Sequence, residues 1–384
     1  MTTLYHSPWM TEELDAFRDQ FRRFLANELA PRAEGWRQDK MVDRAAWRAL
    51  GDIGALLPSV PEAYGGQGGT FAYDAAIIED LEGLVSELAA GYSVHSTIVA
   101  HYILRYGSEA QKRRWLPKLA SGEWIGAIAM TEPGTGSDLQ AVRTTARRRG
   151  NSYRLNGQKT FITNGQRADL IIVVAKTGPG EGAKGISLVV LETAGAEGFR
   201  RGRNLDKIGL HASDTSELFF YDVAVPTENL LGADEGSGFY QLMEQLPQER
   251  LALAIGAVAA IERALGLTID YVKEREAFGQ KLIEFQNTSF TLAERKTEAT
   301  IARIFIDWCI TRHIAGELDT VTASMAKWWC SQKQVETIDD CVQLFGGYGY
   351  MREFPIARMF VDARVQKIYG GTNEIMKLLI ARSL

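Results

Sequence analysis

The chain has 384 residues, 46% of them hydrophobic and 24% charged, and its 43 Lys and Arg against 48 Asp and Glu give a formal net charge of −5. These values are typical of a globular protein of two or three domains and exclude the disordered, collagen-like and coiled-coil classes. A mildly acidic chain has no excess of basic residues for a phosphate backbone, so no nucleic-acid partner is expected.

The cysteines, histidines and N-terminal residues bear on cellular context. Cys309, Cys330 and Cys341 are odd in number and have no CxxC spacing, which argues against a disulfide framework or structural zinc. The five histidines are scattered, so no metal site is expected. The first twenty residues hold four acidic residues and are typical of neither a signal nor a transit peptide, which favours a bacterial-type cytoplasmic protein.

Residues 1–125 predict an N-terminal helical domain. Apolar residues between Leu14 and Leu25 recur at spacings of three and four, which indicates one face of an amphipathic helix. Leu88–Leu104 carries no charge, but it contains Ser, Thr and His. This composition predicts a buried helix rather than a membrane span.

Residues 126–235 predict an all-β domain, a small barrel or sandwich. Short runs of β-branched and aromatic residues predict strands at Tyr153–Leu155, Leu170–Ala175, Ile186–Leu191 and Leu218–Val223. The segment Thr177–Gly185 (TGPGEGAKG) is a turn-rich connection between two of them.

Residues 236–384 predict a C-terminal helical bundle. Helical periodicity covers Leu251–Val272, Gln286–Ile314 and Ala323–Leu344. The order helical, β, helical describes a multi-domain α+β protein. No GxGxxG follows a predicted strand, so a doubly wound nucleotide-binding fold is not expected.

Two segments offer polar donors for a ligand, and the second adds an aromatic side chain. Ala129–Leu139 (AMTEPGTGSDL) offers glycines and hydroxyls, including Thr135, that suit a flat polar ligand. Lys159–Gly165 (KTFITNG) places Phe161 and Thr163 two residues apart on a strand, and hence on one face. Taken singly, the first is more typical of an ordinary turn entering a β-domain, and the second of a strand ending in a hairpin turn at Asn164–Gly165.

Three further segments place glycines near polar groups. These are Arg275–Gln286 (REAFGQKLIEFQ), Gln343–Tyr350 (QLFGGYGY) and Ile368–Ile375 (IYGGTNEI). Paired glycines let a backbone approach a phosphate, but each segment is also typical of an ordinary loop or helix end.

In this order and at these spacings, the segments resemble the acyl-CoA dehydrogenase family over nearly the whole chain. PEAYGGQGG at Pro61–Gly69 and GSEAQKRRWLPKLA at Gly107–Ala120 add to the match. The similarity is greatest to the long-chain members, through LPQERL at Leu246–Leu251 and VDARVQKIYGGTNEIMKLLIAR at Val361–Arg382. The resemblance implies an N-terminal helical domain, a central β-barrel and a C-terminal four-helix bundle.

The resemblance also implies FAD as cofactor. Met130, Thr131, Ser137, Phe161 and Thr163 fall at flavin-contacting positions, with Phe161 where many members have Trp. Residues at positions that reach FAD from a neighbouring subunit are Arg275, Phe278, Gln286, Gln343, Gly346 and Gly347, while Thr372 and Glu374 follow the catalytic turn. A shared FAD implies a homodimer, and the family commonly forms a dimer of dimers.

The implied reaction is α,β-dehydrogenation of an acyl-CoA to a trans-2-enoyl-CoA. A carboxylate takes the α-proton, the β-hydrogen leaves as hydride to flavin N5, and an electron-transfer flavoprotein receives the electrons. The base needs a raised pKa in an apolar pocket, and the thioester carbonyl needs hydrogen-bond donors. Ser137, Arg250, Tyr369 and Gly370 are the substrate-side candidates.

Many members place the base directly after the tyrosine of the final turn, where this chain has Gly370. Long-chain and isovaleryl-type members supply it instead from a bundle helix, as a glutamate before an arginine. Glu249 precedes Arg250 and is the expected base, with Glu374 and Glu353 as alternatives. Pro247 is expected to kink or start the helix and help to aim Glu249.

Two other functions remain open on the sequence. One is an acyl-CoA oxidase or flavin monooxygenase on the same fold. The other is an acyl-CoA- or flavin-binding scaffold without a base, which the glycine at 370 would suit and Glu249 would not.

Overall fold

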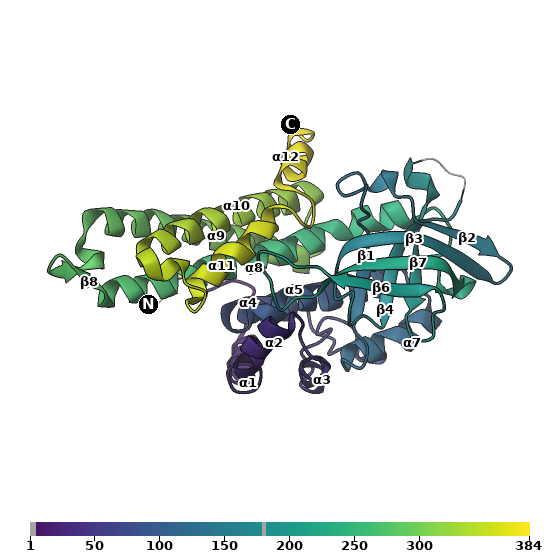
Figure 1. Ribbon diagram of the computed structural model, residues 1–384, viewed down its shortest axis with the longest axis horizontal. Helices are drawn as coiled ribbons and strands as arrows, with labels where there is room; N and C mark the ends of the chain where they lie inside the picture. Colours follow the sequence, from purple (N-terminus) through teal and green to yellow (C-terminus); the bar gives the residue numbers. More distant parts are fainter. Residues whose placement is uncertain (1–4, 179–181) are drawn as a thin grey trace.

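The computed structural model describes residues 5–178 and 182–384, so part of the Thr177–Gly185 connection lies outside the described residues. Helices, then strands, then helices follow one another along the chain, as the sequence predicts (Figure 1).

The N-terminal helices form because their caps and apolar faces agree. Helix α1 (Glu12–Phe24) is capped by Thr11, whose side chain accepts a hydrogen bond from the Leu14 backbone, and it buries Leu14 and Phe21 as predicted. The other helices are α2 (Ala33–Asp39), α3 (Arg44–Asp52), α4 (Phe71–Leu84), α5 (Ser86–Tyr92), α6 (Ala100–Tyr106) and α7 (Glu109–Ala120). A π-helical turn, η4 (Ser93–Val99), joins α5 to α6, so Leu88–Leu104 is helical throughout.

The strands form one seven-stranded sheet. They are β1 (Gly126–Ala129), β2 (Thr145–Arg149), β3 (Ser152–Thr163), β4 (Leu170–Lys176), β5 (Ile186–Glu192), β6 (Phe199–Asn204) and β7 (Thr215–Pro226). The order is β1-β4-β2-β3-β7-β6, with β5 also paired to β4. Within the described residues the end strands do not pair, so the central β-barrel domain that the sequence predicts is an open half-barrel.

Sequence patterns missed strands β1, β2 and β6: β1 has only four residues, and β2 and β6 are rich in arginine and lack an apolar run. The hairpin considered at Asn164–Gly165 is also wrong. The chain turns there, but β3 pairs with β2 and β7, and β4 pairs elsewhere.

The C-terminal unit is built on three long helices. They are α8 (Gly238–Glu274), α9 (Gln286–Ile314) and α10 (Thr320–Phe345), followed by α11 (Pro355–Ala363) and α12 (Asn373–Ala381), with a small hairpin of β8 (Glu276–Ala277) and β9 (Gln280–Lys281) after α8. Helix α8 is already helical ahead of Pro247 and continues through it, so Pro247 does not start a helix.

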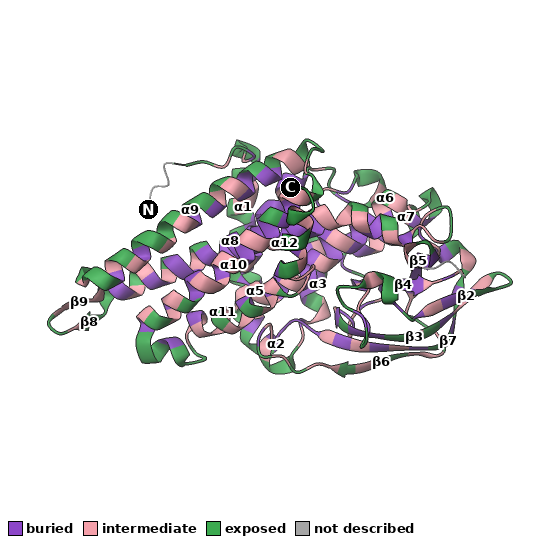
Figure 2. Cartoon of the chain, turned by 90° about the horizontal axis from the view of Figure 1, so that it is seen from above, coloured by how far each residue is buried: buried purple, intermediate pink, exposed green. Residues whose placement is uncertain are grey.

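Helix α8 is the core of the molecule. It is long and apolar enough to cross a membrane, but 72% of its most apolar window is buried inside the protein. Figure 2 shows buried residues concentrated along α8 and its neighbours. One continuous apolar core joins α8 to the N-terminal helices and to β4 and β5, so three units meet around this helix.

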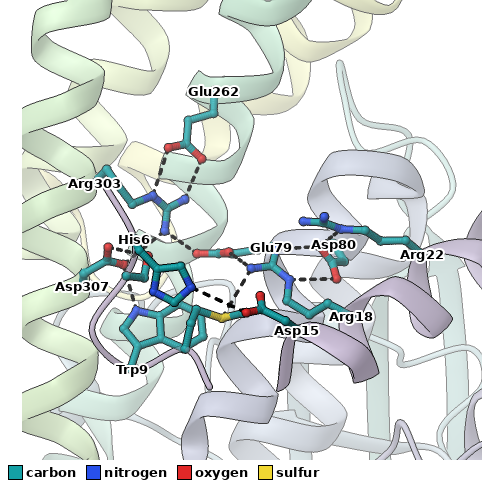
Figure 3. Close-up of polar contacts among 12 residues, drawn as sticks. His6, Trp9, Asp15, Arg18, Arg22, Glu79, Asp80, Glu262, Arg303 and Asp307 are labelled. Atoms are coloured by element: carbon teal, nitrogen blue, oxygen red, sulfur yellow. Dashed lines mark hydrogen bonds and ion pairs between the residues drawn. The ribbon is translucent and has the colours of Figure 1, made fainter. Parts of the chain in front are cut away.

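The N-terminal segment is tied to this core by a charge network (Figure 3). Arg303 on α9 contacts Glu79 on α4, Glu262 on α8 and its own helix neighbour Asp307. Asp307 also accepts a 2.9 Å hydrogen bond from the Trp9 indole. Arg18 adds contacts to Glu79 and Asp80.

Candidate active site

The loop after β1 is braced from within by a buried ion pair. Lys159 Nζ lies 2.9 Å from Glu132 Oε1 and donates to the Met130 carbonyl at 2.8 Å, while Glu132 accepts the backbone N–H groups of residues 143 and 144. A satisfied buried pair holds its surroundings rigidly. It therefore fixes Thr131 and Ser137 beside β3, whereas the Thr135 hydroxyl turns inward to the Ala141 carbonyl.

Strand β3 changes register where it presents Phe161. The pairing with β7 shifts between Lys159 and Ile162, and Phe161 has a left-handed φ of 60°. Its ring is 66% exposed, although a large aromatic side chain is usually covered. A bulge with an uncommon backbone conformation is a frequent way of aiming a side chain at a functional site.

Glu249 lies on α8 in the middle of the molecule and is 6% exposed. Its Oε1 accepts a 2.8 Å hydrogen bond from the hydroxyl of Tyr102. Burial raises the pKa of Glu249 to about 7, although Tyr102 and Arg250 favour the charged form. The carboxyl is therefore able to exchange a proton near neutral pH.

Gly370 and Gly371 form a tight turn against α8 and α10. Both have positive φ, 63° and 90°, which side chains rarely adopt. The Lys327 ammonium donates to the Gly371 carbonyl at 2.6 Å and to Asn373 Oδ1 at 3.1 Å. A Cβ at position 370 would lie 2.3 Å from Leu253 Cδ1, one turn after Glu249.

These parts surround one cavity of about 400 Å³ between the three units. The predicted site residues that line it are Met130, Thr131, Ser137, Phe161, Thr163, Glu249, Arg250, Tyr369 and Gly370. Arg250 is buried and donates to Ser324 on α10 at 3.2 Å, so it contacts the neighbouring helix.

We expect Gly370→Ala to impair activity far more than stability. The left-handed backbone costs alanine about 1–2 kcal/mol, and the new methyl group must also displace Leu253 from the cavity wall. Gly316→Ala is the matched control, because Gly316 has a φ of 71° and no atom lies within 4 Å of the position that its methyl group would take. Thermal unfolding and kcat check this, and equal kcat in both variants would contradict it.

The remaining predicted residues lie elsewhere. Arg275, Gln343, Gly346 and Gly347 line a separate, open surface hollow at the far end of α8. Phe278, in the β8–β9 turn, is 97% exposed, and Gln286 begins α9. Arg275 follows Glu249 by 26 residues of continuous helix, which is about 39 Å. Figure 1 shows the β8 hairpin, which directly follows Arg275, at the end of the bundle away from the sheet, so one chain does not bring the two groups together.

The alternative bases do not face the cavity. Glu374 lies in the first turn of α12, where hydrogen bonds from its own backbone N–H and Thr372 lower its pKa, and the Thr372 hydroxyl caps that helix. Glu353 is exposed in the turn before α11. Neither residue is among those that line the cavity.

Sequence reasoning missed three groups at the site, Glu82, Tyr102 and Lys327. Glu82 on α4 lines the cavity, and burial raises its pKa to about 8. Neither of the other two lines the cavity: Tyr102 holds Glu249, and Lys327 holds the Gly370–Gly371 turn. Lys327, a charged residue beside the apolar Trp328 and Trp329, gives a local signal, whereas Glu82 follows Glu79 and Asp80 and nothing local distinguishes it.

Comparison with known proteins agrees with this architecture. The acyl-CoA dehydrogenase N-terminal, middle and C-terminal domain models match residues 11–123, 127–223 and 236–384. Long-chain specific acyl-CoA dehydrogenase of Sus scrofa mitochondria is 49% identical over 376 residues, covering 97% of this chain and 87% of the relative.

Two solved structures are informative. A Geobacillus kaustophilus acyl-CoA dehydrogenase superposes with a TM-score of 0.96 at 49% identity, covering 98% of this chain and 99% of the other. A Mycobacterium smegmatis glutaryl-CoA dehydrogenase in complex with FADH2 has a TM-score of 0.91 at 29% identity, with 98% and 95% coverage. The chain therefore belongs to the acyl-CoA dehydrogenase family of FAD-dependent oxidoreductases.

Proposed function

We propose that this protein catalyses α,β-dehydrogenation of an acyl-CoA thioester, with Glu249 as the base that removes the α-proton. The observation that carries this proposal is a buried carboxyl with a pKa of about 7 in the wall of the cavity that holds the predicted site residues. A base whose pKa is near the working pH is suited to proton abstraction from a weak carbon acid.

The turn at Gly370 supplies the second requirement. Among the hydrogen bonds of residues 5–178 and 182–384, none uses the Gly370 N–H. A fixed, unused backbone donor on the cavity wall suits a thioester carbonyl that gains charge as the α-proton leaves. Lys327 would keep this donor in place by holding the next carbonyl.

The residues present fit FAD. Phe161 is an exposed ring on a bulged strand, with Thr131, Ser137 and Thr163 as hydroxyl donors along the same wall. These features suit a flat, polar-edged ring system packed on an aromatic face. When bound there, FAD would supply the hydride acceptor.

We propose that a second copy of the chain completes the cofactor site. Arg275, Gly346 and Gly347 offer a cation and an open glycine turn at the far end of the bundle, with nothing within 4 Å of either glycine's Cβ position. A homodimer would bring this surface to the cavity of its partner. A dimer of dimers, an electron-transfer flavoprotein as acceptor, and domains at 1–125, 126–235 and 236–384 complete the proposal.

A long-chain or branched acyl group is the proposed substrate. The cavity wall is apolar along the α5–η4 segment, with Ala89, Ala90, Val94 and Ile98, and α8 adds Gly256. Small side chains leave depth for hydrocarbon, and burial of each methylene favours binding by about 0.8 kcal/mol.

The test is anaerobic titration of the FAD-loaded protein with palmitoyl-CoA. Loss of the oxidised flavin absorbance, with stoichiometric enoyl-CoA, supports the proposal. A flavin that stays oxidised with every acyl-CoA in a chain-length series overturns it in favour of a binding scaffold. Rapid reoxidation by air with peroxide release would instead identify an oxidase.

We expect kcat/KM for palmitoyl-CoA to rise with pH through about 7 and then level off. The base works only when deprotonated, and burial raises the pKa of Glu249 to about 7, so activity is lost as pH falls through that value. A pH series of initial rates checks this. A fall in kcat/KM centred near pH 4.3, the ordinary pKa of a glutamate, would contradict the assignment of Glu249 as the base.

A further inference from the structure

The residue that holds the proposed base comes from a different domain and does not line the cavity. Tyr102, on α6, is completely buried, and its hydroxyl donates to Glu249 Oε1 at 2.8 Å. Oε2 of Glu249 has no hydrogen-bond partner among the described residues, and Glu249 lines the cavity. One oxygen is therefore held and the other remains available to a proton.

The backbone behind Tyr102 explains why it faces α8. The π-helical turn η4 immediately precedes α6 and changes the direction in which later side chains point, by about 100° for each extra residue. Gln248, next to Glu249, donates to the Thr97 carbonyl of this turn at 2.6 Å. Two successive residues of α8 thus contact the η4–α6 segment, which fixes the rotation of α8 at the base.

A second tyrosine one turn later gives an internal comparison. Tyr106 contacts α8 through the Gln241 carbonyl at 3.2 Å and Glu244 Oε2 at 2.9 Å, and not through Glu249. The two rings lie 6.2 Å apart. Tyr102 and Tyr106 therefore make similar interhelical contacts, but only the first touches the proposed base.

We propose that Tyr102 is a positioning residue for Glu249, holding Oε1 against α6 so that Oε2 is presented to the cavity. This inference rests on the proposed function, in which Glu249 is the base. A hydrogen bond to the charged carboxylate also favours that form, so Tyr102 limits the rise that burial causes in the pKa of Glu249. The other titratable or charged groups around Glu249 are Arg250 on its own helix, Glu82 on α4 and Lys327 on α10. Burial raises the pKa of Glu82 to about 8 and lowers the pKa of Lys327 to about 7.

The test compares Tyr102→Phe with Tyr106→Phe in the FAD-loaded enzyme. We expect Tyr102→Phe to lower kcat about tenfold at neutral pH. KM should be nearly unchanged, because the phenol does not line the cavity. The acid limb of the pH profile, where activity falls as the base takes a proton, should move about one pH unit higher. Tyr106→Phe should move neither. An unmoved limb in Tyr102→Phe, or equal shifts in both variants, would overturn the inference.

A second measurement does not depend on turnover. Infrared titration of the Glu249 carboxyl C=O band, identified by its loss in Glu249→Gln, should show a higher pKa in Tyr102→Phe. A ring-fluorinated tyrosine at position 102 is a stronger donor and should move the pKa the opposite way; a shift in the same direction contradicts the inference. If Glu249→Gln keeps its activity, Glu249 is not the base and that part of the proposed function fails. If the band does not shift while Glu249→Gln is inactive, only the role of Tyr102 fails.

Discussion

We expect Glu249→Gln to lower kcat for palmitoyl-CoA by about a thousandfold, through slower flavin reduction rather than weaker binding. A positioned general base contributes about 10²–10⁴-fold, and glutamine keeps the size of glutamate while it cannot take the α-proton. The amide oxygen can still accept the Tyr102 hydrogen bond, so the helix packing should survive. Stopped-flow reduction of the flavin under anaerobic conditions, together with acyl-CoA binding, checks this.

Two further variants locate the effect. Glu244→Gln, five residues earlier on α8, removes an exposed carboxylate that pairs with Arg105, and it should reduce flavin at the normal rate. Glu82→Gln changes the other carboxyl in the cavity wall. If acyl-CoA no longer reduces the flavin of Glu82→Gln but still reduces that of Glu249→Gln, the base is Glu82 and our assignment is wrong.

Arg303→Met is expected to destabilise the protein by about 3–5 kcal/mol, the usual cost of removing one partner from a buried ion network. Methionine keeps the length and apolar character of the side chain, but Glu79 and Asp307 lose a cation while still buried (Figure 3). Burial already raises the pKa of Glu79, and Arg303 opposes that rise. The loss of stability in Arg303→Met should therefore become smaller as pH falls and Glu79 takes a proton.

The matched control is Arg312→Met on the same helix. Arg312 pairs with Glu317 at 3.0 Å, and both side chains are exposed, so its loss should cost less than about 1 kcal/mol. Denaturant unfolding of the FAD-loaded proteins at one concentration compares them. Equal stability losses in the two variants would show that the network of Figure 3 adds nothing beyond surface pairing.

Features that depend on residues close in sequence were predictable. Apolar spacing in α1 and helical periodicity in α9 identified those helices, and α9 has the predicted bounds, Gln286–Ile314. The loop that carries Thr131 and Ser137 and the strand that carries Phe161 were also recognised. Local periodicity and turn chemistry are written in neighbouring residues, so they can be read without the fold.

Features that depend on distant contacts were not predictable. Tyr102 and Glu249 are 147 positions apart, and Lys159 on β3 meets Glu132 in the loop after β1, 27 positions away. Strand β6 has alternating arginines and glycine, with no apolar run to mark it. In each case the partner is decided by how the units pack.

By itself the sequence determined the family, the order of the three units and Glu249 as the candidate base, because those conclusions rest on motifs and their spacing. Only the tertiary structure decided that Glu249 is buried with a raised pKa, that Glu82 shares its cavity, and that Arg275 lies at the other end of α8. The physical reason is that desolvation and proximity belong to the packed assembly of helices, whereas a sequence specifies only which groups are available.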